Sequence, residues 1–202
     1  MSVRIVIAED QTMVRQALVA LLGLEGDIEV VAEAATGNEA LAMARLHKPD
    51  VILLDIEMPG ADGIEVARRL PADGYAGKTI IVTTFGRPGY LKAAMGAGAS
   101  GFLLKDAPAG DLARAIRRVH AGELVVDPAL AAAALAEGAS PLTPREADVL
   151  AAARGHAAIA ELAERLHLSR GTVRNHLSAA IQKLGARNRA EAVQIAERKG
   201  WL

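Results

Sequence analysis

The chain contains no cysteine. Disulfide bonds, thiolate metal sites and cysteine nucleophiles are therefore excluded. It also lacks an apolar run that approaches the roughly 20 residues of a membrane-spanning helix, and its first residues, MSVRIVIAEDQ, reach acidic side chains too early for a signal peptide. Hydrophobic residues nevertheless make up 51% of the 202 residues, enough for a packed core. We expect a globular protein of the cytoplasm.

A net charge of only −1 conceals an uneven distribution of charge along the chain. Residues 1–140 carry five more acidic than basic side chains, whereas residues 141–202 carry four more basic than acidic ones. This difference indicates two parts with different partners, the second of them suited to a polyanion.

Short β-branched segments and helical segments alternate through the first 120 residues. The predicted strands are Val3–Ala8, Ile28–Ala34, Val51–Leu54, Thr79–Thr83 and Gly101–Leu104. The predicted helices are Met13–Leu22, Asn38–Leu46, Gly63–Leu70, Gly89–Ala97 and Gly110–Ala121. Such alternation is typical of a parallel sheet covered by helices on both faces. We expect an α/β, doubly wound, five-stranded parallel sheet of the flavodoxin-like type, with its site at the carboxyl ends of the strands.

The pattern changes after Gly122. Residues 122–141 are predicted to form a linker with a short Ala-rich helix that ends at Gly138. From Leu142 onward no strand-like run occurs, so the remainder is expected to be all-helical. The predicted organisation is a first domain at 1–121, a linker at 122–141 and a second domain at 142–202.

Three acidic residues lie at the ends of predicted strands. Glu9 and Asp10 follow the first strand, and Asp55 follows the third. Neighbouring central strands would bring the three carboxylates together, where their mutual repulsion favours a bound divalent cation. Carboxylate oxygens are ligands suited to Mg²⁺. With the metal bound, the Asp55 carboxylate can act as a nucleophile on a phosphoryl group and form an acyl phosphate.

Two further strands end in residues that suit the same chemistry. Thr83 supplies a hydroxyl and Lys105 a cation, and both could hold the oxygens of a transferred phosphoryl group. Acidic residues also gather at strand ends simply because loops are solvated. That alternative explains Glu9 and Asp10 alone, but it does not explain an Asp, a Thr and a Lys that each end a different strand.

Four segments of the first domain resemble the receiver domain of two-component response regulators. They are AEDQ at 8–11, LLDIEMPGADG at 53–63, IIVTTF at 80–85 and GFLLKD at 101–106, and the resemblance runs through residues 3–121. It implies a phosphorylation site with a bound Mg²⁺.

The resemblance also assigns roles to individual residues. Asp55 would be the phosphoacceptor, and the metal ligands would be Glu9, Asp10, Asp55 and the backbone carbonyl of Glu57. The phosphate-sensing residues would be Thr83 and Lys105, with Phe102 at the switch position that often carries Tyr. Phe102 can still rotate inward, although it lacks the hydroxyl of Tyr.

In the second domain, two short helices and a tight turn are predicted. The first helix spans Ala157–Leu166, HLSRG forms the turn, and Ser169 is a suitable N-cap for the second helix. The spacing of four apolar residues gives that helix one buried stripe, formed by Val173, Leu177, Ile181 and Leu184. Arg174, Asn175 and Ser178 fall on another face.

This arrangement is typical of a helix-turn-helix. Arg can read guanine and Asn adenine in the major groove, whereas Ser is less selective. Cations that are placed to meet DNA phosphates are Arg165, Arg170, Lys183 and Arg187.

Two segments resemble the tetra-helical DNA-binding domain of the LuxR/NarL family: LTPREADVL at 142–150 and LSRGTVRNHLSAAIQKLGARNRAEA at 168–192. The resemblance implies that Arg174, Asn175 and Ser178 contact DNA bases. The residues that would pack the helices together are Glu146, Leu150, Val173 and Leu184. His156 departs from the family, which usually has Gly there, and we expect its side chain to be exposed in a turn.

Together the two resemblances imply a DNA-binding transcriptional regulator rather than an enzyme. A sensor histidine kinase would phosphorylate Asp55, and the phosphorylated chain would form a homodimer and bind double-stranded promoter DNA, with RNA polymerase as a further partner. The dimer would form through the fourth helix, fifth strand and fifth helix, or through the first and fifth helices.

Within the family, three segments resemble DesR-type regulators of membrane fluidity: TTFGRPGY at 83–90, DIEMPG at 55–60 and the final ERKGWL. This resemblance implies control of a fatty-acid desaturase gene.

Two alternatives are compatible with the same residues. The chain could be a phosphorylation-independent DNA-binding regulator with the receiver as a dimerisation module, although all five acidic, hydroxyl and lysine positions of the site are intact. It could also be a phosphohydrolase with Asp55 as nucleophile and Glu57 as acid/base. That second alternative lacks a substrate-capping insertion and leaves the basic helical domain unexplained.

Overall fold

The computed structural model describes residues 2–84, 86, 88–136 and 140–202. These residues form two compact units: the described residues of 1–86 and 91–131, and those of 87–90 and 132–202. Each unit has a hydrophobic core of its own. Among the described residues, no helix is both long enough and apolar enough to cross a membrane.

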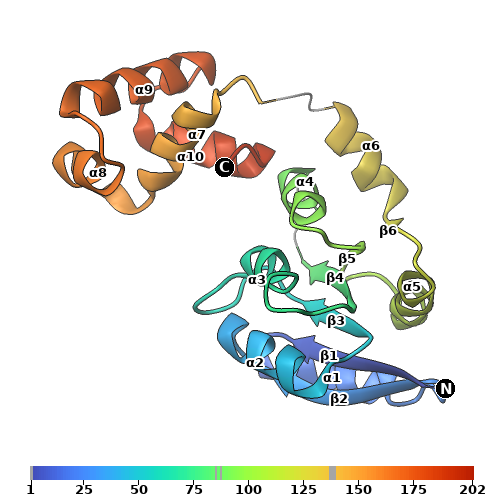
Figure 1. Ribbon diagram of the computed structural model, residues 1–202. Helices are drawn as coiled ribbons and strands as arrows, with labels where there is room; N and C mark the ends of the chain where they lie inside the picture. Colours follow the sequence, from blue (N-terminus) through green and yellow to red (C-terminus); the bar gives the residue numbers. More distant parts are fainter. Residues whose placement is uncertain (1, 85, 87, 137–139) are drawn as a thin grey trace. The chain divides into compact units, whose positions relative to one another are not determined.

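The first unit is built on a six-stranded parallel sheet with the strand order β2-β1-β3-β4-β5-β6 (Figure 1). The strands are β1 (Val3–Ala8), β2 (Ile28–Ala34), β3 (Val51–Leu54), β4 (Lys78–Thr83), β5 (Gly101–Leu104) and β6 (Val125–Val126). The doubly wound parallel sheet is confirmed, but the strand number of five is corrected to six. The additional strand, β6, has only two residues and pairs with Gly101 and Phe102 of β5. A two-residue strand is too short to give a periodic pattern in the sequence.

Helices cover both faces of this sheet. The helices are α1 (Thr12–Leu22), α2 (Gly37–His47), α3 (Gly63–Arg69), α4 (Pro88–Gly96) and α5 (Ala109–His120). On one face, α1 and α5 pack with alternate residues of the strands into one core cluster, to which β3 contributes Val51 and Leu53. The intervening Ile52 and Leu54 are also fully buried, on the opposite face because side chains alternate along a strand. The continuous apolar run of β3 therefore reflects a central strand that is buried on both sides.

The second unit is helical. After α6 (Pro128–Ala136), its elements are α7 (Pro144–Ala152), the 3₁₀ turn η1 (Arg154–His156), α8 (Ile159–Arg165), α9 (Arg170–Lys183) and α10 (Arg189–Lys199). Helix α8 begins two residues later than predicted, because Ala158 has an extended backbone at its N-cap. The predicted end of α6 at Gly138 and the predicted exposure of the His156 side chain lie outside what the structure describes.

Side-chain caps set the starts of the helices in this unit. The Thr143 hydroxyl accepts a hydrogen bond from the Glu146 amide, and the Glu146 carboxylate accepts one from the Thr143 amide, which forms a capping box at the start of α7. The predicted N-cap at Ser169 is confirmed: its hydroxyl accepts a hydrogen bond of 3.0 Å from the Thr172 amide. Asn188 caps α10 in the same manner. Each cap satisfies a backbone amide that the helix leaves without an internal partner.

The predicted buried stripe of α9 also lies in a core. Val173, Leu177, Ile181 and Leu184 all pack into the hydrophobic cluster of the second unit.

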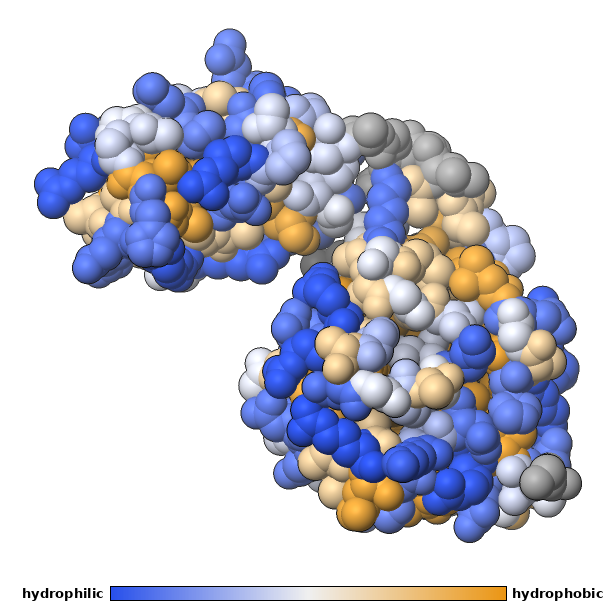
Figure 2. Space-filling view, in the orientation of Figure 1, coloured by the Kyte–Doolittle hydropathy of each residue, from blue (hydrophilic) through white to orange (hydrophobic). Residues whose placement is uncertain are grey.

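On the face that Figure 2 shows, the surfaces of both units are largely hydrophilic with scattered apolar patches. This is usual when each unit buries most of its apolar side chains internally.

Candidate functional site

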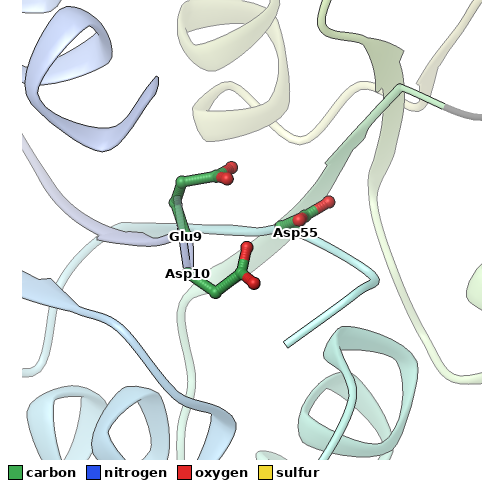
Figure 3. Close-up of side chains that lie close together, drawn as sticks. All are labelled: Glu9, Asp10 and Asp55. Atoms are coloured by element: carbon green, nitrogen blue, oxygen red, sulfur yellow. The ribbon is translucent and has the colours of Figure 1, made fainter. Parts of the chain in front are cut away.

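The acidic cluster lies where two neighbouring strands of the sheet end. Strands β1 and β3 are paired up to Ala8 and Leu54, and the Asp55 amide donates to the Ala8 carbonyl at 2.9 Å. Carboxylate oxygens of Glu9, Asp10 and Asp55 all lie within 4.8 Å of one another. Figure 3 shows Glu9 and Asp10 extending from the end of β1 toward Asp55. The structure thus brings together the three acidic side chains that the strand pattern predicted.

Lys105 joins two members of the cluster. Its Nζ atom lies 2.6 Å from Glu9 Oε2 and 3.0 Å from Asp55 Oδ2, and its side chain is only 8% exposed. The Lys105 amide also donates to the carbonyl of Thr83 at 2.8 Å, which ties the ends of β4 and β5 together. One ammonium therefore offsets part of the repulsion between two buried carboxylates.

The charge of the cluster remains unbalanced without a further cation. Burial raises the pKa of the Glu9 carboxyl above its ordinary value, and the charge of Asp55 acts in the same direction, against the hydrogen bond from Lys105. Among the described residues, Asp10 Oδ1 is buried and accepts no hydrogen bond. A buried carboxylate oxygen without a donor is costly unless a metal coordinates it. The residues present therefore fit a hard divalent cation such as Mg²⁺.

The structure also places the other predicted residues of the receiver site and a further contact of Asp55. Its Oδ1 atom accepts a hydrogen bond of 2.8 Å from the Ile56 amide. Thr83 ends β4 and Phe102 lies on β5, and both are completely buried. The side chain of Glu57, whose backbone carbonyl is the predicted ligand, is exposed. Because the Phe102 side chain is completely buried, it already occupies an inward position in this structure.

Arg15 is a neighbour of the cluster that the sequence did not reveal. Its Nη1 atom donates to the backbone carbonyl of Glu9 at 2.6 Å, and its Nε atom donates to Glu33 Oε2 at 3.2 Å. An Arg in the first half of a helix ordinarily faces solvent, and no motif marked it. Only the conformation of the loop after β1 places an acceptor within its reach.

In the helical unit, α9 presents the three predicted base-reading residues to solvent. Arg174, Asn175 and Ser178 are all exposed, whereas Val173 and Leu177 on the other face are buried. Arg170 is exposed as well. Because residues four apart share one face of a helix, Arg170, Arg174 and Ser178 form a single stripe.

Three of the four cations predicted to meet phosphates have partners within the unit. Lys183 Nζ lies 2.7 Å from Glu146 Oε2, Arg165 donates to the carbonyl of Ala152, and Arg187 pairs with Glu191. These three side chains therefore also make contacts within the helical unit, to α7 and α10.

Comparison with known families accounts for both units. Residues 5–117 match the response regulator receiver domain, and residues 140–196 match the luxR family of bacterial regulatory proteins. An uncharacterized transcriptional regulatory protein of Bacillus subtilis, YvfU, is 46% identical over 99% of this chain and 100% of its own length. The transcriptional regulatory protein DesR of the same species is 45% identical and covers 99% of both chains.

A solved structure supports the same assignment. The response regulator ChrA of a heme-sensing two-component system is 33% identical, covers 100% of this chain and 99% of its own, and has a TM-score of 0.59. The chain belongs to the two-component response regulators of the NarL/LuxR family, in which a receiver domain is joined to a luxR-type DNA-binding domain.

Proposed function

We propose that a sensor histidine kinase transfers a phosphoryl group to Asp55, and that the phosphorylated chain forms a homodimer and binds promoter DNA. The observation that carries this proposal is the cluster of Glu9, Asp10 and Asp55, with Glu9 and Asp55 buried and Lys105 bridging these two. A carboxylate nucleophile, a cation site and a lysine ammonium side by side are the parts that phosphoryl transfer to an aspartate requires.

The transfer is a displacement at phosphorus. An Asp55 carboxylate oxygen attacks the phosphorus, the bond from phosphorus to the imidazole nitrogen of the kinase breaks, and its electron pair leaves with the imidazole. Mg²⁺, held by Glu9, Asp10, Asp55 and the backbone carbonyl of Glu57, would neutralise charge on the phosphoryl oxygens. Lys105 would turn from Glu9 toward the new phosphate, and the Thr83 hydroxyl would donate to it, with Phe102 packed behind.

The DNA-binding step is assigned to α9. Arg174, Asn175 and Ser178 would contact base edges in the major groove, and Arg170 and Lys183 would contact phosphates. For Lys183 this contact competes with its ion pair to Glu146. A dimer would place two copies of α9 on half-sites about one DNA turn apart. The resemblance to DesR-type regulators supports a fatty-acid desaturase gene as the target, with RNA polymerase as the next partner.

A small phosphodonor tests the proposal. The full chain is incubated with Mg²⁺ and acetyl phosphate, and its mass and oligomeric state are compared with those of Asp55→Ala. Glu57→Ala is the matched control, since it removes an exposed carboxylate from the same loop and leaves its backbone carbonyl in place. We expect a phosphoryl adduct and a dimer in the wild type and the control, and neither in Asp55→Ala.

Other outcomes separate the alternatives. Equal dimerisation and DNA binding in the wild type and Asp55→Ala, with or without the donor, would favour a phosphorylation-independent regulator. Rapid turnover of the donor that depends on Glu57 would instead favour a phosphohydrolase.

A further inference from the structure

Arg15 holds the peptide group that joins the two acidic residues after β1. Its side chain is only 14% exposed, although it lies on a surface helix. The carbonyl that accepts its 2.6 Å hydrogen bond is that of Glu9, and this carbonyl shares one peptide plane with the amide nitrogen of Asp10. Because the peptide group is planar, a bond to the carbonyl also orients the Asp10 Cα atom.

Asp10 depends on this backbone orientation more than its two neighbours do. The Glu9 carboxylate is held by Lys105 and by the Gln11 amide at 3.3 Å. The Asp55 carboxylate is held by Lys105 and by the Ile56 amide. Among the described residues, nothing donates to the buried Oδ1 atom of Asp10. The direction of that carboxylate is thus set by its backbone and not by a side-chain partner.

We propose that Arg15 is a positioning residue for the metal site: through the Glu9 carbonyl it orients Asp10 toward Mg²⁺. This inference rests on the metal site of the proposed function. An Arg suits the task because its planar fork donates to the Glu9 carbonyl and to the Glu33 carboxylate at the same time, which a Lys ammonium does not reproduce. Loss of such an outer partner ordinarily lowers metal affinity about 10- to 100-fold.

The direction of the change in Mg²⁺ affinity distinguishes a positioning role of Arg15 from a purely electrostatic one. Arg15 is a cation beside a cation site, so removal of its charge alone would strengthen Mg²⁺ binding. Removal of a hydrogen bond that positions a metal ligand would instead weaken Mg²⁺ binding. The two roles therefore predict opposite shifts of the dissociation constant.

The test measures Mg²⁺ binding to the unphosphorylated full chain through amide chemical shifts of the isotopically labelled protein. Arg15→Met removes both hydrogen bonds and keeps the aliphatic stem. Glu33→Gln is the matched control, because it removes the ionic partner of Arg15 and leaves the bond to the Glu9 carbonyl. We expect the dissociation constant to rise about tenfold or more in Arg15→Met and to change less than about twofold in Glu33→Gln, since an ion pair whose carboxylate is exposed to solvent contributes little.

A double-mutant cycle identifies the residue through which Arg15 acts. In an Asp10→Asn background, Arg15→Met should have little further effect on Mg²⁺ affinity, whereas a general structural weakening would lower the affinity by the same factor in both backgrounds. If Arg15→Met does not fold, as judged by urea unfolding in a chelator, Arg15→Lys replaces it with the same expected direction.

The possible failures are distinguishable. A wild-type chain that does not bind Mg²⁺ contradicts the metal site of the proposed function. A wild-type chain that binds Mg²⁺, together with an Arg15 variant that binds equally or more tightly, overturns only the role of Arg15.

Discussion

At the scale of single residues, Gly63 shows how closely the backbone is packed around Asp55. It is the first residue of α3, after the N-cap Asp62. A Cβ atom at this position would overlap the carbonyl oxygen of Asp55 and lie 2.9 Å from its carbonyl carbon. Both atoms belong to backbone, so neither can move aside without shifting the loop that carries Asp55.

We therefore predict that Gly63→Ala destabilises the receiver unit by about 1–3 kcal/mol, the usual effect of overpacking. Urea unfolding followed by far-ultraviolet circular dichroism measures the loss. Gly26→Ala is the control, because nothing lies within 4 Å of a Cβ atom there. Equal stability of the two variants would show that the loop after β3 adapts at little cost.

At the scale of helices and strands, the regular pattern of the first unit was predictable and its short elements were not. Strands β1, β2, β3 and β5 have their predicted bounds, and β4 begins one residue earlier. The alternation of apolar strands and amphipathic helices repeats often enough to specify a parallel sheet. Strand β6 is only Val125–Val126, and its pairing depends on the position of β5 and not on a pattern of its own.

The candidate sites likewise contain some features that were predictable from the sequence and others that were not. The convergence of Glu9, Asp10 and Asp55 follows from parallel strands that end at one edge, so strand order alone was sufficient. The contacts of Arg15 and Lys183 were not predictable. Each depends on an acceptor that the tertiary fold supplies, the Glu9 carbonyl for Arg15 and the Glu146 carboxylate for Lys183.

The ion pair between Glu146 of α7 and Lys183 of α9 makes the stability of the helical unit depend on pH. The hydrogen bond from Lys183 holds the pKa of the Glu146 carboxyl below its ordinary value of 4.5, and the Thr143 amide acts in the same direction. A carboxyl whose folded pKa is depressed adds stability above its unfolded pKa and loses it as the pH falls through the folded pKa. We predict that the wild type is more stable than Glu146→Gln at neutral pH, and that this difference shrinks as the pH falls below 4.5.

Fluorescence of Trp201 during urea unfolding provides the measurement. It is the only tryptophan of the chain and packs against the core of the helical unit, so the signal reports that unit. Glu164→Gln, which changes an exposed acid of α8, is the control. In a Lys183→Met background, the effect of Glu146→Gln should be smaller. A difference that stays constant between neutral and acidic pH would exclude a functional ion pair.

At the scale of the whole chain, the two units differ in the sign of their charge. The acidic excess lies within residues 1–140, which include the acidic cluster, and the basic excess lies within residues 141–202, which include α9. Basic charge draws a protein to DNA without regard to sequence. Selectivity between DNA sequences must then come from side chains that reach base edges.

A variant of Arg174 tests whether this side chain contributes to selectivity between DNA sequences or only to general affinity for DNA. A duplex that the phosphorylated chain prefers is first selected from a random pool, and its affinity is compared with that for random DNA at one fixed salt concentration. Because a bidentate contact to guanine discriminates between bases, Arg174→Ala should weaken binding to the selected duplex by about 1–3 kcal/mol and leave binding to random DNA nearly unchanged. Arg198→Ala, an exposed cation of α10, is the matched control and should not alter the preference. An equal loss on both duplexes would make Arg174 a phosphate contact, and the selectivity of α9 would then be assigned to Asn175 and Ser178.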